Sequence, residues 1–286
     1  MIDKIQIVKA VQIIECYGTN SIPLKVLCDD NEIYVIKTMF KKHAPFEDLI
    51  NETLSNYFLQ CWNIPVPEQA IVEFDDILVE QFLLENKTIN KKYIDFQFNN
   101  HFFYGTKFLP YATEIDLYNI TLKDKHDYNK YENPIDLIKI GAFDKWIANM
   151  DRRIDNPNIL IDNTGKKFRF IPIDHTQSFA NQTNYKNLKI AIMDTVNNKS
   201  ILNSPITKSI SNFANSKKYS NLANEITGNI DNTIASFDAI FDNIPSEFGL
   251  SKQGKVKIKE ILSNKTRNED VSRLYLNYSK WNHFTA

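Results

Sequence analysis

The hydrophobic period of this chain changes near residue 46, from two residues to between three and four, and that change most constrains its fold. Before it, IPLKVLCDD and EIYVIKTMF are rich in strand-forming residues, and the polar turn at 29–31 between them predicts a hairpin. After it, apolar residues at three- and four-residue spacings predict one amphipathic helix over 46–61, which ends before Pro65. One helix embedded among strands is typical of a small lobe that mixes both structures.

The following segments extend this order. EQAIVEF and DILVEQFLL predict a second hairpin around Asp75 and Asp76, and we interpret residues 86–104 as an insertion or loop. From about Pro110 the pattern becomes helical, and NPIDLIKIGAFDKWIANM predicts a helix with an Asn-Pro start signal. A short hairpin turning near 163–165 and several further helices complete the chain.

The predicted fold class is therefore α+β. The order of elements indicates a bilobal, protein-kinase-like fold, with a small β-rich N-lobe (residues 1–106) carrying one helix and a larger helical C-lobe (residues 107–286). Other α+β enzymes share this layout, so function has to be argued from particular residues.

Composition excludes several classes of protein. With 34 Lys and Arg against 35 Asp and Glu, the net charge of −1 predicts no nucleic-acid or anionic-membrane partner. The three cysteines are too few and wrongly spaced for a zinc site, and they fit a reducing compartment. No apolar run is long enough to span a bilayer, so we expect a cytoplasmic protein.

Two polar segments carry the candidate chemistry. NMDRRIDNPNIL directly follows the apolar helix, and Asp174 ends the strand-like run FIPID. Phosphoryl transfer uses a loop Asp, an Asn five residues later and a further Asp after a short hairpin, and Asp151, Asn156 and Asp174 have that spacing. Asn156 and Asp174 are therefore candidate ligands of Mg²⁺, and Asp151 is the candidate catalytic residue.

The first third of the chain supplies candidate nucleotide-binding residues. Lys37 ends the strand YVIK, where an ammonium needs an acid or a phosphate as a partner, and Glu52 lies fifteen residues on in the predicted helix. A turn between the first two strands could offer backbone N–H groups to phosphate oxygens. That turn consists of Gly18, Thr19, Asn20 and Ser21.

Each feature alone has an ordinary structural interpretation. Lys37 is compatible with a solvated strand residue and Glu52 with the exposed face of its helix. Asp151, Arg152 and Arg153 are compatible with a loop tied by surface ion pairs, which stabilise little. Five such features in the kinase order favour a nucleotide site.

These segments resemble the HipA-like kinase family, in the branch that lacks an extra N-terminal subdomain. The resemblance spans about residues 8–180, and NIPSEFGL is weakly similar to the C-terminal helical section of that branch. It implies ATP and Mg²⁺ as cofactors, with Lys37 on the α/β-phosphates and Glu52 paired to it. It also implies that Asp151 orients the acceptor hydroxyl, while Asn156 and Asp174 bind magnesium.

Further expectations come only from this resemblance. The segment FYGTKFLPYA, around Lys107 and Phe108, would be the hinge whose backbone touches adenine. The substrate would be a Ser or Thr hydroxyl on a protein, with autophosphorylation at Thr19 or Ser21, and a toxin–antitoxin role would add an antitoxin or regulatory partner. The motifs G-x-G-x-x-G, H-R-D, D-F-G and A-P-E of ordinary protein kinases are absent from the sequence.

Three alternatives stay open at this point. The chain could be a catalytically inactive nucleotide-binding scaffold, or it could transfer AMP rather than phosphate. Because phosphoinositide kinases also use a D-R-x-x-x-N loop, a lipid or small-molecule acceptor is the third.

Overall fold

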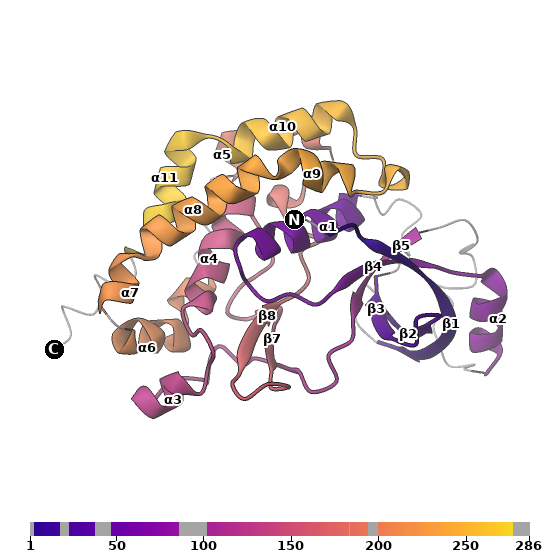
Figure 1. The fold of residues 1–286 in the computed structure, drawn as a ribbon, viewed down its shortest axis with the longest axis horizontal. Helices are drawn as coiled ribbons and strands as arrows, with labels where there is room; N and C mark the ends of the chain where they lie inside the picture. Colours follow the sequence, from indigo (N-terminus) through magenta and orange to yellow (C-terminus); the bar gives the residue numbers. More distant parts are fainter. Residues whose placement is uncertain are drawn as a thin grey trace.

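The computed structural model describes residues 3–17, 23–37, 47–85, 102–182, 184–193, 200–214 and 216–276. Five strands form a barrel at one end of the molecule, helices form the other end, and helix α1 (Glu47–Cys61) lies between them (Figure 1). The predicted α+β fold, with a β-rich N-terminal part and a helical C-terminal part, is confirmed.

The barrel closes because its first and fourth strands pair in parallel. The order is β1-β2-β3-β5-β4, and the β2–β3 hairpin predicted at 29–31 is confirmed. A Cβ at Gly105 would lie 2.9 Å from Val72 Cγ2 and 3.0 Å from Ile36 Cγ2, so this interior position has room only for glycine. The strands are β1 (Gln6–Cys16), β2 (Leu24–Cys28), β3 (Ile33–Ile36), β4 (Gln69–Glu73) and β5 (Phe102–Lys107).

The second predicted hairpin is wrong. Strand β4 is followed by a helix, α2 (Asp76–Glu85), rather than by a strand. Asp75 starts this helix, since its carboxylate accepts a hydrogen bond from the Ile77 N–H at 2.9 Å. Val79 and Phe82, three residues apart, are the buried residues of the helix and pack into the barrel's hydrophobic cluster.

Helix α1 is confirmed as a helix but is not amphipathic. Every residue from Leu49 to Leu59 is buried, including the polar Asn51, Glu52 and Ser55. A helix that is buried all round must satisfy its polar side chains inside the protein, so these residues need partners from other elements.

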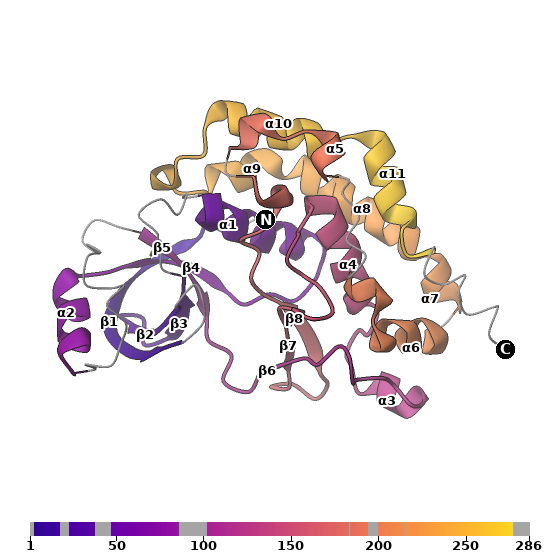
Figure 2. The same cartoon turned by 180° about the vertical axis from the view of Figure 1, so that it is seen from behind.

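The C-terminal part combines a small sheet with many helices. Helix α4 (Asp136–Ile147) runs through its centre, and the sheet of β6 (Thr113–Glu114), β7 (Ile159–Asp162) and β8 (Arg169–Pro172) lies below it in both views (Figure 2). The predicted helix and the predicted hairpin near 163–165 are both confirmed. The other helices are α3 (Lys125–Asn129), α5 (Ile190–Met193), α6 (Pro205–Phe213), α7 (Ser216–Ser220), α8 (Leu222–Ala235), α9 (Phe237–Asp242), α10 (Lys252–Leu262) and α11 (Lys265–Arg273). Among the described helices, none is both long and apolar enough to cross a bilayer.

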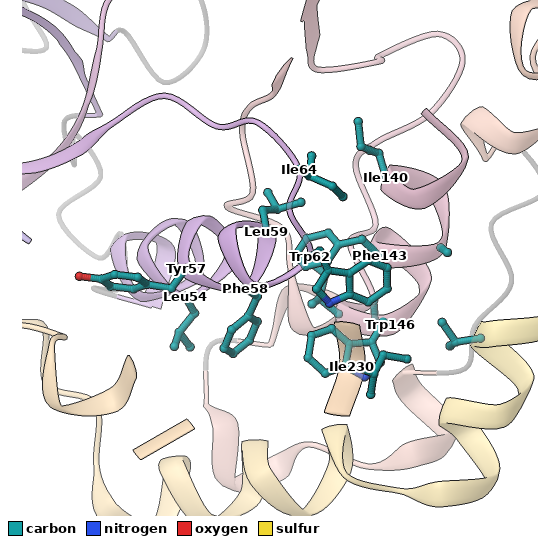
Figure 3. Close-up of a cluster of buried hydrophobic side chains, with 14 of the residues drawn as sticks. Leu54, Tyr57, Phe58, Leu59, Trp62, Ile64, Ile140, Phe143, Trp146 and Ile230 are labelled. Atoms are coloured by element: carbon teal, nitrogen blue, oxygen red, sulfur yellow. The ribbon is translucent and has the colours of Figure 1, made fainter. Parts of the chain in front are cut away.

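Aromatic side chains join α1 to the C-terminal part. The Trp62 ring lies 5.3 Å from the Phe143 ring and 5.7 Å from the Trp146 ring, centroid to centroid, and Phe58 lies 5.5 Å from Trp146. Figure 3 shows these rings packed together between the end of α1 and helix α4, with Ile230 of α8 close by. Because all four rings are fully buried, this cluster fixes the end of α1 on the helical part.

Trp62 offers a test of that joint. Trp62→Ala is expected to lower the free energy of unfolding by about 3–5 kcal/mol, because it leaves a large cavity. Trp62→Phe should cost clearly less, since the Nε1–H has no hydrogen-bond partner within the described residues and its loss removes an unpaired donor. Urea denaturation of the two variants checks this, and equal costs would contradict it.

Candidate active site

Lys37 directly follows strand β3 and brings two carboxylates together. Its Nζ forms ion pairs with Glu52 of α1 and, at 2.6 Å, with Asp174, which lies two residues after β8. We call these three residues the Lys37 cluster. Burial alone would lower the pKa of Lys37, but the two carboxylates outweigh it and hold that pKa above its ordinary value. Burial would likewise raise the pKa values of Glu52 and Asp174, yet the ammonium holds both below their usual range.

Glu52 has a second set of partners. Its Oε1 accepts a hydrogen bond from the His175 backbone N–H at 3.0 Å, and its Oε2 lies 3.6 Å from His175 Nδ1. Burial lowers the pKa of His175, and the nearby Arg152 charge lowers it further, so the imidazole is neutral at pH 7. Because Arg152 can only donate to Nε2, we place the ring proton on Nδ1, facing Glu52.

The polar loop after α4 holds Asp151. The helix ends at Ala148, whose left-handed backbone (φ 52°) turns the chain away from the helix axis. Asp151 Oδ2 accepts a hydrogen bond from Asn158 Nδ2 at 3.2 Å, and Asn156 Nδ2 donates to the Asp151 carbonyl at 3.4 Å. These bonds fix the Asp151 carboxylate and commit the Asn156 amide nitrogen to the loop.

The loop of Asp151 and the loop of Asp174 are joined directly. The Ile173 N–H donates to the Asn158 carbonyl at 2.9 Å, so the residues just before Asp174 lie beside those just after Asn156. Asn158 (φ 45°) and Asp174 (φ 57°) both have left-handed backbones. Backbone strain of this kind collects at functional sites, and Asn and Asp are the residues that tolerate it best.

Helix α1 is also bonded to the Asp174 loop. Asn51 Nδ2 donates to the Thr176 carbonyl at 2.7 Å, and the Ser55 and Ser178 hydroxyls lie 3.2 Å apart. Asn51, Glu52 and Ser55, three buried polar residues of α1, therefore have partners in this loop. The Lys37 cluster is held from both lobes.

Arg152 is the main structural residue that the sequence did not reveal. Its side chain is 0% exposed, which rules out the surface ion-pair interpretation. The guanidinium pairs with Asp144 of α4 at 3.0 Å and donates to His175 Nε2 at 2.8 Å. Asp144, a carboxylate that follows the aromatic Phe143 and lies among apolar residues of α4, was the available signal for a buried partner.

The expected hinge residues lie away from the Lys37 cluster. Lys107 Nζ pairs with Glu32 at 2.8 Å, and the Phe108 ring lies 3.7 Å below the ammonium of Lys25. The Lys107 N–H donates to the Glu68 carbonyl at 2.8 Å, and the Phe108 N–H donates to the Ile33 carbonyl at 2.7 Å. Both amides are committed within the protein, which leaves only carbonyl groups at these positions for a nucleobase.

One predicted group cannot be placed. Gly18, Thr19, Asn20 and Ser21 lie outside the described residues. The described part of the chain contains no group of three or more His, Cys, Asp or Glu side chains arranged to hold a metal ion.

Solved structures share this fold. The Helicobacter pylori proinflammatory kinase CtkA matches with a TM-score of 0.55 at 14% identity, over 97% of this chain and 99% of that one. Two structures of the Golgi casein kinase are more distant, one of them with Mn and ADP bound. Their TM-scores are 0.42 and 0.46, at 12% and 11% identity, over 93% and 96% of this chain and 73% and 74% of those chains. The similarity to CtkA identifies a protein-kinase-like fold.

The family follows from the sequence. A family model described as HipA-like kinase matches residues 17–277, and the chain therefore belongs to the HipA-like kinase family. The comparison with curated proteins found no match. Family and fold together support a protein-kinase-like phosphotransferase.

The Lys37 cluster predicts a particular dependence of stability on pH. Carboxylates with lowered pKa values stabilise the folded state above their unfolded pKa, about 4, and that contribution is lost as pH falls below it. Lys37→Met removes the ammonium, so burial and mutual repulsion raise both pKa values. The variant should be much less stable than wild type at pH 7, and this difference should shrink between about pH 6 and about pH 3.

Urea unfolding at stepped pH checks this expectation. Lys9→Met removes an equal charge from an exposed barrel residue, and its effect should not change over the same range. If the loss of stability in Lys37→Met is also constant over this pH range, the sharing of the Lys37 ammonium by Glu52 and Asp174 is contradicted.

Proposed function

We propose that this chain is an ATP- and magnesium-dependent kinase that phosphorylates Ser or Thr hydroxyls on a protein. The observation that carries the proposal is the Lys37 cluster, in which one ammonium joins an N-lobe helix to a C-lobe loop beside Asp151. Kinases need a lysine on the phosphates, a glutamate that holds it and an aspartate beside the metal, and the cluster has these three groups in one place.

The nucleotide and metal roles follow from the chemistry of the donors. Lys37 would bind the α/β-phosphates while Glu52, which is only 4% exposed, keeps the ammonium in place. Asp174 and the amide oxygen of Asn156 offer hard oxygen ligands, which fit Mg²⁺ if phosphate oxygens and water complete the set. When bound, such an ion would neutralise charge on the transferring phosphoryl group.

Asp151 would orient the acceptor. Its Oδ2 is held by Asn158, and its Oδ1 lies 4.0 Å from Arg153 Nη1, which leaves that oxygen to accept a hydrogen bond from a hydroxyl. The hydroxyl oxygen attacks the γ-phosphorus, its proton passes to the Asp151 carboxylate, and the bond to ADP breaks. The protein's part in this reaction is positioning and charge compensation.

The remaining expectations belong to the same proposal. The N-lobe would comprise residues 1–106 and the C-lobe residues 107–286, with the adenine between them near the carbonyl groups of Lys107 and Phe108. The turn 18–21 would contact phosphate through its backbone, and Thr19 and Ser21 would be sites of autophosphorylation. An antitoxin or regulatory partner is a further candidate ligand of the chain.

Asp151→Asn tests the catalytic assignment. The variant should lose at least about 100-fold in transfer rate, because the amide cannot take up the proton, while ATP binding stays close to wild type. Asp231→Asn makes the same change at an exposed position on α8 and should leave the rate unchanged. Undiminished transfer by Asp151→Asn would refute the role.

Mass spectrometry of the acceptor separates the alternatives. Phosphorylation adds about 80 Da and AMP transfer about 329 Da. Stable ATP binding by the wild-type chain with neither product nor ATP turnover would instead favour the inactive scaffold.

A further inference from the structure

Arg152 contacts both loops of the candidate site and the His175 ring beside Glu52. Its Nη1 donates to three backbone carbonyls, those of Pro157 and Ile173 at 3.1 Å each and that of Asn158. Pro157 and Asn158 come just after Asn156, and Ile173 comes just before Asp174. One guanidinium therefore spans the gap between the two loops that carry the proposed metal ligands.

The same guanidinium is connected to the Lys37 cluster. Its Nη2 donates to His175 Nε2 at 2.8 Å, and the other edge of that ring faces Glu52 at 3.6 Å. Its Nε is anchored on Asp144 of α4, which lies in the centre of the C-terminal part. The path from α4 to Lys37 thus runs through Arg152, His175 and Glu52 without a break.

We propose that Arg152 is a positioning residue that sets the separation of Asn156 and Asp174, and so the affinity of the site for a nucleotide-bound divalent ion. This role rests on the proposed function. Two features of the site support it. Backbone bonds join the two contacted loops at Ile173 with Asn158, 2.9 Å, and at Met150 with Gln177, 3.2 Å, and Arg152 adds side-chain bonds to both loops next to the proposed ligands. The Nε, Nη1 and Nη2 groups of one planar guanidinium reach Asp144, the loop carbonyls and His175 in different directions, which a single ammonium cannot do.

The energetic argument points the same way. A buried guanidinium with no exposed area loses its hydration, and only full pairing offsets that cost. A buried ion pair is weak evidence for stability, because apolar residues could fill the same space at no greater cost. The bonds from Arg152 to backbone next to both metal-binding positions instead indicate a role in fixing geometry.

Arg152→Lys tests the proposal, with Mn²⁺ and ADP as the probe. Mn²⁺ is titrated into the protein with ADP, and electron paramagnetic resonance measures the Mn²⁺ that stays free. Supporting groups around metal ligands commonly contribute 10- to 100-fold in affinity, so Arg152→Lys should bind Mn²⁺ with ADP roughly 10- to 100-fold more weakly. Its affinity for ADP without metal should change little.

A matched control comes from a second buried arginine. Arg267 of α11 is 3% exposed and donates to the Lys145 carbonyl of α4 at 2.6 Å. Arg267→Lys should lower the melting temperature as Arg152→Lys does, but leave Mn²⁺ binding at the wild-type level. Should Arg152→Lys fail to fold, Asp144→Asn keeps the shape of the anchor, removes its charge and should weaken Mn²⁺ binding in the same direction.

The outcomes are separable. If the wild-type chain binds Mn²⁺ with ADP, and Arg152→Lys and Arg267→Lys bind Mn²⁺ with equal affinity, the positioning role is overturned and the proposed function stands. Absence of Mn²⁺ and ADP binding by the wild-type chain would overturn both. Weakened binding that is confined to Arg152→Lys and Asp144→Asn would support the role.

Discussion

The sharing of one ammonium between two carboxylates is the interaction on which the rest of the site depends. Lys37 comes from the barrel, Glu52 from the helix between the lobes and Asp174 from the loop after the small sheet. With a single positive charge among them, the three groups keep one net negative charge. That negative charge makes the site suited to a cation. Because the groups are buried, removing any one of them would leave an unpaired charge in the interior, at a large cost in free energy.

Helix α1 turns this local interaction into a property of the whole molecule. Its Asn51 and Ser55 side chains bind the Asp174 loop, while Phe58 and Trp62 at its C-terminal end pack against α4. A helix with no solvated face cannot move without unpairing polar groups on one side and opening a cavity on the other. The position of Glu52, and through it of Lys37, is therefore set by core packing as much as by charge.

The sequence predicted the fold class, helices α1 and α4, and two of the hairpins, because their apolar spacing and turn residues were unambiguous. It failed for α2, where Asp75 was interpreted as a hairpin turn although it caps a helix. Single residues at such a boundary favour turns and N-caps alike, and only the barrel surface that receives Val79 and Phe82 decides between them.

The site shows the same division between local signal and tertiary context. Lys37, Glu52 and Asp174 were predicted as site residues from their order along the chain, and the structure brings these three into contact. Arg152 was not found, since an arginine beside a loop Asp is usually solvated. Its burial is determined by Asp144, eight residues earlier, and by carbonyl groups from two loops. No spacing rule encodes a convergence of that kind.

The unequal exposure of the two carboxylates indicates how the site would accept a ligand. Glu52 is 4% exposed and has His175 as a further donor, whereas Asp174 is 33% exposed and accepts a hydrogen bond from the Thr176 hydroxyl besides its ion pair with Lys37. An incoming cation would therefore compete for Asp174, and a phosphate would take its place beside Lys37. The ammonium would exchange one anion for another while Glu52 stays, so we expect binding to change the partners of Lys37 without moving α1.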